Sequence, residues 1–190
     1  MGVGDFRMKD LLARAFEYQE NYGIVGRAHY LAADHNSALY RYFGIPVIVI
    51  TAVVGTTIFG TLNENPDPIW RIITGLILLA GTILSSLQTS LGFAQIAEKH
   101  KAAGQVYRAV WRRFGMFCLK YAQGTPDQRQ AAFDELQKIV ESLDEMPREF
   151  PTVLDRFYEK AKKEQREENR RLSAQQGASA DRPNATAASN

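Results

Sequence analysis

The stretch Phe43–Leu62, FGIPVIVITAVVGTTIFGTL, decides the fold class, because it contains no charged side chain. As an α-helix, about twenty residues extend about 30 Å, which matches the hydrocarbon thickness of a bilayer. A second charge-free run, Ile72–Phe93, follows after a short polar connection. Because backbone amides find no water in lipid, a spanning segment must be helical. We predict two membrane-spanning helices, at 43–62 and 70–93.

The alternative is a soluble bundle in which both apolar helices are buried core. The mean hydropathy of the chain is slightly negative, which would fit a soluble protein if the apolar residues were evenly spread. They are instead concentrated between Tyr42 and Ala97. Core helices are rarely apolar on every side over such a length. Two in tandem therefore favour the membrane.

The distribution of charge predicts the orientation. The connection Asn63–Pro68 holds two acids and no base. Of the 23 lysines and arginines, all but Arg71 lie before Tyr42 or after Phe93. Basic residues collect on the cytoplasmic side of membrane proteins. We therefore expect a multi-pass protein of the inner (plasma) membrane with both termini in the cytoplasm.

Apolar and aromatic residues recur at alternating spacings of four and three on both sides of the apolar runs, from Leu11 to Phe43 and from Ile96 to Tyr121. This spacing is typical of helices packed at a shallow angle. The expected fold is all-α, a two-transmembrane helical hairpin extended into cytoplasmic helices. Pro46, placed in the first turn of the membrane helix, predicts a break or kink near Phe43–Gly44.

Three regions are expected along the chain. Residues 1–124 form the two-transmembrane domain. Residues 125–172 form a cytoplasmic helical extension, with one helix from Thr125 to just before Pro147 and another that starts at Pro151. Residues 173–190, rich in Ser, Ala, Gln and Asn, are expected to be a disordered tail.

The sequence lacks a glycine-rich phosphate loop, paired cysteines and a zinc-protease motif. No nucleophile, base and orienting group can be placed together. We predict that the protein is not an enzyme and has no catalytic, metal-binding or cofactor-binding residues. A net charge of +2 argues against nucleic acid as a partner. Cys118, the single cysteine, is expected to be a buried thiol in a reducing compartment.

The second span is two-sided. One face collects small, hydroxyl and amide residues, and aliphatic residues cover the other. Either the polar face packs against another helix, with Ala52, Thr56 and Gly60 of the first span as the matching ridge, or it lines a water-filled path. Packing is the simpler explanation, Gln88 leans toward the path because an amide in lipid needs a partner or water, and in an oligomer both can hold. The candidate pore-lining or packing residues are Thr74, Gly81, Thr82, Ser85, Gln88, Thr89 and Gly92.

Two histidines, His29 and His100, fall on the regular spacing of the cytoplasmic helices. Such a residue facing tyrosines is commonly a hydrogen-bonded core side chain. The sharper hypothesis is that the two histidines meet across the helix pair and respond to pH.

Several segments resemble the SLATT domain, a two-transmembrane effector associated with SMODS nucleotidyltransferases and SLOG sensors in bacterial conflict systems. The similar segments lie between Tyr18 and Tyr121, and HKAAGQVY, residues 100–107, is the most telling. The others are RYFGIP at the start of the first span, VVGTTIFGTL at its end, Trp70, LSSLQTSLGF at the end of the second span and AEKHKAAGQVYRAVWRRF after it.

The resemblance implies antiphage defence by abortive infection, in which a nucleotide signal from a partner enzyme or sensor triggers membrane disruption. Two helices enclose no lumen, so a pore requires a homo-oligomer. The cytoplasmic pair would then be the bistable element, and its candidate gating residues are Tyr22, His29, His100 and Tyr107. The expected partners are the lipid bilayer, further copies of the chain, and a nucleotidyltransferase or nucleotide sensor. Two other hypotheses stay open: a membrane-anchored scaffold that recruits a soluble partner, and a small soluble helical module.

Overall fold

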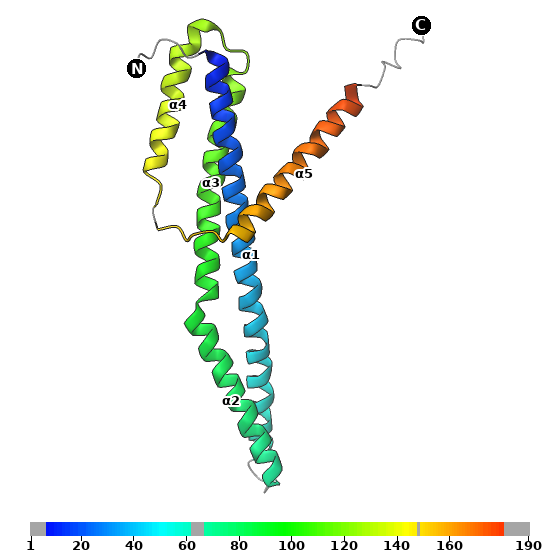
Figure 1. Cartoon of the computed structure of the whole chain (residues 1–190). Helices are drawn as coiled ribbons and strands as arrows, with labels where there is room; N and C mark the ends of the chain where they lie inside the picture. The colour runs from blue at the N-terminus through cyan, green and yellow to red at the C-terminus, as the bar shows by residue number, and fades with distance from the viewer. Residues whose placement is uncertain (1–6, 62–66, 148, 181–190) are drawn as a thin grey trace, which may run out of the picture. The chain divides into compact units, whose positions relative to one another are not determined.

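The computed structural model describes residues 7–61, 67–147 and 149–180, with the backbone alone at 57–61 and 176–180. These residues form helices and loops and include no strand, which confirms the all-α class. Figure 1 shows the helices in chain order: α1 (Met8–Thr61), α2 (Pro68–Leu91), α3 (Phe93–Tyr121), the 3-10 turn η1 (Pro126–Gln128), α4 (Arg129–Asp144) and α5 (Asp155–Ala180).

Helix α1 runs without a break from Met8 to Thr61 and carries Pro46 in its interior. Of the predicted break or kink near Phe43–Gly44, the break is therefore wrong, and the kink stays a prediction. Proline lacks the amide hydrogen that would bond the carbonyl four residues earlier, here that of Tyr42. In membrane helices, neighbouring helices and local adjustments compensate for this loss. Gly23 and Gly26, which also weaken a long helix in principle, lie within the same helix.

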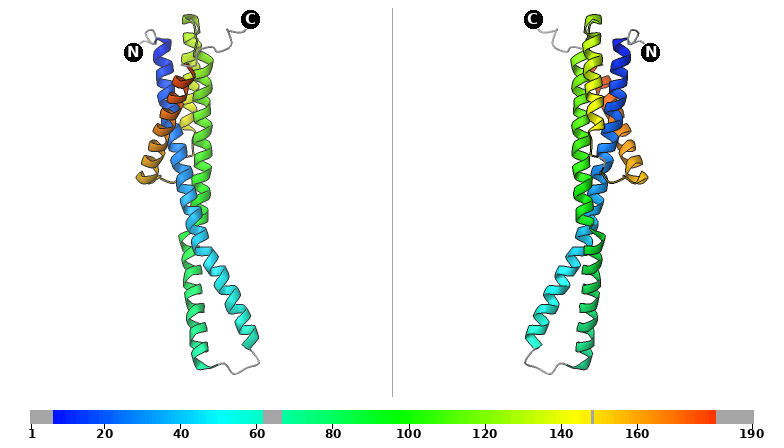
Figure 2. Two further views of the ribbon diagram at one scale, coloured as in Figure 1. Left: turned by 90° about the vertical axis from the view of Figure 1, so that its right-hand side faces the viewer. Right: turned by 90° about the vertical axis from the view of Figure 1, so that its left-hand side faces the viewer.

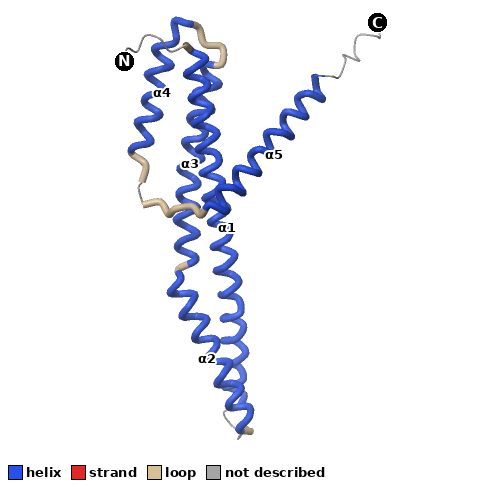
Figure 3. The backbone as a smooth tube through the Cα atoms, in the orientation of Figure 1, coloured by secondary structure: helices blue, strands red, loops and turns tan. Residues whose placement is uncertain are grey.

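The helix of the second apolar run, in contrast, ends at Gly92, one residue before the end of that run. Gly92 has φ 56° and ψ 30°, the left-handed conformation that ends many helices. Helix α3 begins at the next residue, and the amide of Ile96 donates to the Gly92 carbonyl at 3.0 Å. In Figure 3 a short tan segment between the blue helices α2 and α3 marks this junction.

The starts of α2 and α4 follow from local chemistry. The Asp67 side chain accepts a hydrogen bond from the Ile69 amide at 3.2 Å, and Pro68 occupies the first turn. Thr125 and Gln128 form a capping box around Pro126, in agreement with the predicted helix start there.

Helix α5 differs from its predicted bounds at both ends. It begins at Asp155 rather than at Pro151, and it continues to Ala180. The segment 173–180 is thus helical, not disordered as expected. The rest of the predicted tail, 181–190, lies outside the described residues.

The chain divides into two compact units that do not follow the predicted boundary at residue 124. The bundle unit comprises Met1–Leu31 and Ala102–Asn190, and the apolar unit comprises Ala32–Lys101. Helices α1 and α3 each contribute to both units, which is why a division along the sequence could not separate them.

The bundle unit has a well-packed core made by α1, α3 and α4. Phe114 and Phe117 of α3 are 0% and 1% exposed. They pack against side chains of α1 and α3 that recur every three or four residues, and against the apolar face of α4. The buried members are Leu11, Ala15, Val110, Phe114, Phe117, Tyr121, Ala132 and Leu136.

Two glycines let α1 and α3 approach closely within the bundle unit. A Cβ on Gly26 would lie 3.2 Å from the Tyr107 Cβ, and a Cβ on Gly104 would lie 3.1 Å from the Tyr30 ring. Residues without a side chain at such a crossing bring the helix backbones together. Gly26 thus serves packing rather than helix termination.

The first turns of α5 are fixed to α1. Ala161 is buried against Ile24 and Ala28. Beside this contact, the Arg27 guanidinium of α1 pairs with Glu164 at 2.7 Å and with Glu168 at 3.2 Å. Pairs with this much exposure contribute about 0–1 kcal/mol each, so the apolar contact and the two ion pairs together give α5 a modest attachment.

Candidate functional site

The apolar unit exposes large hydrophobic side chains that a soluble protein would bury. Ile48 is 70% exposed, Leu76 is 61% exposed and Leu79 is 57% exposed. The most apolar window of each long helical segment is only 6% buried, and both segments are long and apolar enough to cross a membrane. Contiguous exposed apolar surface of this kind marks contact with a membrane or another protein. Low burial also speaks against the alternative of two core helices.

Within the apolar unit, α1 touches α2 and the first residue of α3 along one line. The rings of Phe43 and Phe93 stack at 5.9 Å. A Cβ on Gly44 would lie 2.9 Å from the Gln88 amide nitrogen, and a Cβ on Gly81 would lie 3.2 Å from Ile50. From Phe43 to Ile50 on α1, the contacted residues run backward in the sequence from Phe93 to Gly81, so the two segments are antiparallel where they touch. Figure 2 shows the two ribbons diverging toward the end of α1 and the start of α2.

The contact face of α1 is not the predicted ridge. Ala52 and Thr56 are exposed, and the surroundings of Gly60 are outside the described side chains. The buried residues of this segment are instead Gly44 and Val54, flanked by partly buried Val47 and Ile50. The prediction failed because it looked for small residues at four-residue steps. The covered positions instead follow steps of three, three and four, and all but Gly44 are β-branched.

The polar face predicted for α2 is divided between two environments. Gly81 is buried against α1, and Thr74, Gln88 and Gly92 are partly buried. Thr82, Ser85 and Thr89 point away from this contact and are exposed. Packing within the chain therefore accounts for one half of the face and leaves the hydroxyl-bearing half uncovered.

The exposed threonines satisfy their own hydroxyl groups. Thr82 donates to the Leu78 carbonyl at 2.9 Å, and Thr89 donates to the Ser85 carbonyl at 3.0 Å. This back-bonding lets a threonine face lipid without another partner. Gln88 differs, because in the described part of the chain its amide makes no hydrogen bond. The Ser85 hydroxyl, one helical turn earlier, likewise has none among the described residues.

Aromatic rings form a continuous column in the bundle unit, between α1 and α3. His29 stacks on Tyr107 at 5.2 Å, and Tyr107 stacks on Tyr22 at 6.0 Å. Tyr22 in turn stacks on Phe114 at 6.0 Å. We call Tyr22, His29, Tyr107 and Phe114 the aromatic column. Three of the four predicted gating residues thus meet in one place.

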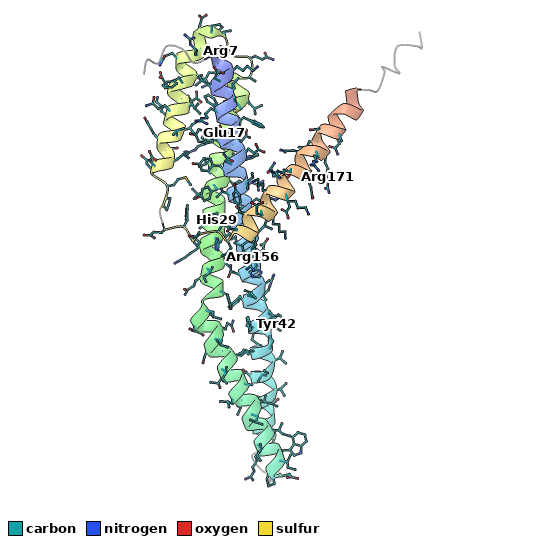
Figure 4. All side chains as sticks on the ribbon, viewed as in Figure 1. Arg7, Glu17, His29, Tyr42, Arg156 and Arg171 are labelled. Atoms are coloured by element: carbon teal, nitrogen blue, oxygen red, sulfur yellow. The ribbon has the colours of Figure 1, made fainter. Side chains whose placement is uncertain are left out.

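His29, labelled in Figure 4, is 3% exposed. His100, the fourth predicted gating residue, belongs to the apolar unit and is 6% exposed. Burial lowers the pKa of His100 because it disfavours the charged imidazolium. Burial and the neighbouring Tyr107 phenol raise the pKa of Tyr22.

Two features of these regions were not predicted from the sequence. Phe150, in the segment between α4 and α5, packs on both His29 and Tyr107. Its position just before Pro151 was the only local signal. The second feature is a groove at the start of the apolar part of α1, lined by residues that include Arg41, Tyr42 and Pro46.

Three further features bear on possible chemistry: metal ligands, the cysteine thiol and a charged groove. Among the described residues, no group of three or more His, Cys, Asp or Glu could hold a metal ion. Cys118 is a free, half-buried thiol, and burial raises its pKa. A groove of about 730 Å³ between α3 and α4 carries three bases (Arg112, Arg113 and Lys120) and one acid, Glu135.

The chain was compared with protein-family models, with curated proteins and with solved structures, and none of them matches it.

Proposed function

We propose that the protein is a pore-forming membrane effector whose two apolar helices form a hairpin in the bilayer and assemble with further copies of the chain. In this arrangement α2 supplies the interior surface. The cytoplasmic bundle holds the assembly closed until a signalling partner acts on it. The proposal assigns no catalytic step to the chain and places both termini in the cytoplasm of a bacterial cell, as the charge distribution favours.

The Gln88 amide carries the proposal. In hydrocarbon, an amide without a hydrogen-bond partner costs several kcal/mol, about 2–7 by transfer measurements. Gln88 has no partner in the described part of the chain, so its partner must be water or another molecule. An oligomer whose α2 helices face a shared aqueous path supplies both.

The exposed hydroxyl surface supports the same arrangement. Thr82, Ser85 and Thr89 lie beside the α1 contact without being covered by it. Small and hydroxyl-bearing residues are the ones that membrane helices use to approach one another. One part of the polar face can therefore serve the hairpin and the other part the contact between copies.

The resemblance to SLATT domains adds the setting, a bacterial defence system in which a nucleotidyltransferase or nucleotide sensor provides the trigger. The aromatic column is the proposed gate, because its stacked rings join α1 to α3 where the bundle unit is buried. A bistable element of this kind needs two packings of similar free energy.

The test is leakage of the full chain reconstituted in dye-loaded liposomes, with membrane potential measured in cells during regulated expression. Ser85→Leu combined with Gln88→Leu should slow leakage by about tenfold, since interhelical hydrogen bonds in membranes contribute about 0.6–1.7 kcal/mol each. Ile77→Leu combined with Ile83→Leu, on the aliphatic face of the same helix, should leak as the wild type does, because it changes neither polar group. Equal leakage by the first pair and the wild type would refute the pore-lining assignment.

A scaffold that recruits a soluble partner is the second candidate. Met116 and Leu119 on α3 are 67% and 73% exposed in the bundle unit, beside the groove that carries three bases. Exposed apolar side chains next to charges suit a protein interface. Stoichiometric capture of one partner, lost in Leu119→Asp, together with an unchanged membrane potential, would favour the scaffold over the pore.

A further inference from the structure

The groove at the start of the apolar part of α1 has the composition of a binding site for a phospholipid. Its volume is about 720 Å³, and it lies between α1 and α2 within the apolar unit. The wall from α1 includes Arg41, Tyr42, Ile45 and Pro46, and Leu84 closes it from α2. Ala38 and Phe43 complete the lining, so Arg41 and Tyr42 are its only residues with polar side-chain groups.

Arg41 is the last charge before the first apolar run, so in the proposed membrane hairpin it lies at the cytoplasmic interface. Among the described residues, no acid pairs with it. The groove lining contains no acid either. A guanidinium at this depth, with free donors in a fork, matches the geometry of a phosphate group.

Tyr42, labelled in Figure 4, is 74% exposed, and it precedes the apolar wall. A tyrosine at a membrane interface places its ring among the acyl chains and its hydroxyl among the headgroups. Ile45 is 59% exposed and offers an open apolar surface one turn deeper. Two adjacent polar donors beside apolar walls that continue along α1 and onto α2 suit an amphiphile better than a soluble anion.

We propose that this groove binds one anionic phospholipid of the cytoplasmic leaflet. The headgroup phosphate accepts hydrogen bonds from Arg41 and from the Tyr42 hydroxyl, and an acyl chain lies against Ile45, Pro46 and Leu84. The inference rests on the membrane placement in the proposed function. It adds a specific lipid as ligand, and it does not depend on whether the assembly conducts.

The test uses the purified full chain in phosphatidylcholine vesicles that contain either spin-labelled phosphatidylglycerol or spin-labelled phosphatidylcholine. Electron paramagnetic resonance reports the motionally restricted fraction of each lipid. We expect phosphatidylglycerol to be preferred, and Arg41→Gln to reduce this preference by about fivefold, the effect of one interfacial base. Arg71→Gln, which removes an exposed base from the start of the other span, is the matched control and should keep it.

A second variant separates a seated lipid from diffuse attraction. Leu84→Trp fills the groove and leaves every charge in place, so it should reduce the preference as Arg41→Gln does; far-UV circular dichroism checks the fold of both. A preference that survives Leu84→Trp would overturn the proposal in favour of diffuse charge. Displacement by inorganic phosphate at constant ionic strength would overturn it in favour of a simple anion site.

The remaining outcomes distinguish this inference from the proposed function. Restricted lipid without any preference for phosphatidylglycerol would overturn the groove site and leave the membrane hairpin intact. The absence of restricted lipid of either kind would overturn both, because it would mean that the apolar unit is not embedded. Unchanged dye leakage in Arg41→Gln with a lost lipid preference would support the site as distinct from the pore.

Discussion

The bundle unit and the apolar unit share helices α1 and α3, yet large hydrophobic side chains are buried in the first and exposed in the second. In the bundle unit, Phe114 and Phe117 are 0% and 1% exposed, whereas in the apolar unit Ile48 and Leu76 are 70% and 61% exposed. Helix α1 is continuous through both. The same helix therefore buries one apolar face against its neighbours in the bundle unit, and exposes apolar side chains on nearly every side in the apolar unit. The bundle unit satisfies its hydrophobic side chains within the chain, whereas those of the apolar unit are left for contact with something outside it.

The largest expected effect comes from breaking the core of the bundle unit. Phe114→Ala removes a fully buried ring that also belongs to the aromatic column, and should lower the free energy of unfolding by about 3–5 kcal/mol. Met116→Ala, two residues away and 67% exposed, should change it by less than about 0.5 kcal/mol. Denaturant unfolding of the full chain in detergent, followed by circular dichroism, measures both. Equal effects would mean that this core does not stabilise the unit.

The next prediction applies one substitution to both units. Leu79→Arg puts a charge in the middle of α2, which should disfavour membrane insertion by about 2.5–3.5 kcal/mol. Leu119→Arg makes the same change at a residue of the bundle unit that is 73% exposed, and should be neutral. Membrane association resistant to carbonate extraction is the readout. If Leu79→Arg is retained in the membrane like the wild type, the second apolar helix does not span it.

Two glycines of the second apolar segment differ in backbone conformation, and substitution of each tests that difference. Gly92→Ala forces a side chain into the left-handed conformation and should destabilise the α2–α3 junction by about 1 kcal/mol. Gly75→Ala, in the body of α2 with open space around it, should be neutral or stabilising. Thermal unfolding in detergent distinguishes the signs. A shift of the same sign for both would argue against a strained backbone at Gly92.

The smallest effect concerns pH. The folded state lowers the pKa of His100 through burial, so it binds fewer protons than the unfolded state in mildly acidic solution. The resulting contribution to stability is fully present above the unfolded pKa of about 6.5. It is lost as the pH falls through that value toward the folded pKa. The melting temperature of His100→Gln should therefore fall less than that of the wild type between pH 7.5 and 5.5, and an equal fall would exclude His100 as the source.

Much of the helical architecture was predictable from the sequence, because it depends on spacing and local chemistry. The alternation of three and four predicted which residues of α1 and α3 are buried in the bundle unit, such as Ala15 and Val110. The run Thr125-Pro126-Asp127 predicted a helix start, and the structure begins η1 and then α4 there. Pro46 misled as a sign of a helix end, because α1 continues through it without the one backbone hydrogen bond that proline cannot make.

The candidate site was predictable only in part. Side-chain chemistry identified the polar face of α2, but not which half of it contacts α1, since that depends on where Gly44 and Gly81 allow close approach. Phe150 contacts the aromatic column from the loop between α4 and α5, and the course of a loop cannot be inferred from the spacing of apolar residues. The groove beside Arg41 involves Leu84, which lies on the aliphatic face of α2 and not on the polar face predicted to carry function.

Cys118 gives the molecule its own reporter. As the only cysteine of the chain, it can be alkylated at one defined place without engineering. Its thiol is partly covered by the same core that holds α1, α3 and α4 together, and that cover keeps the reactive thiolate scarce. Any activating signal that loosens the bundle would uncover the sulfur and speed the reaction. The rate of labelling therefore reads out the state of the bundle in intact cells, before any leak begins.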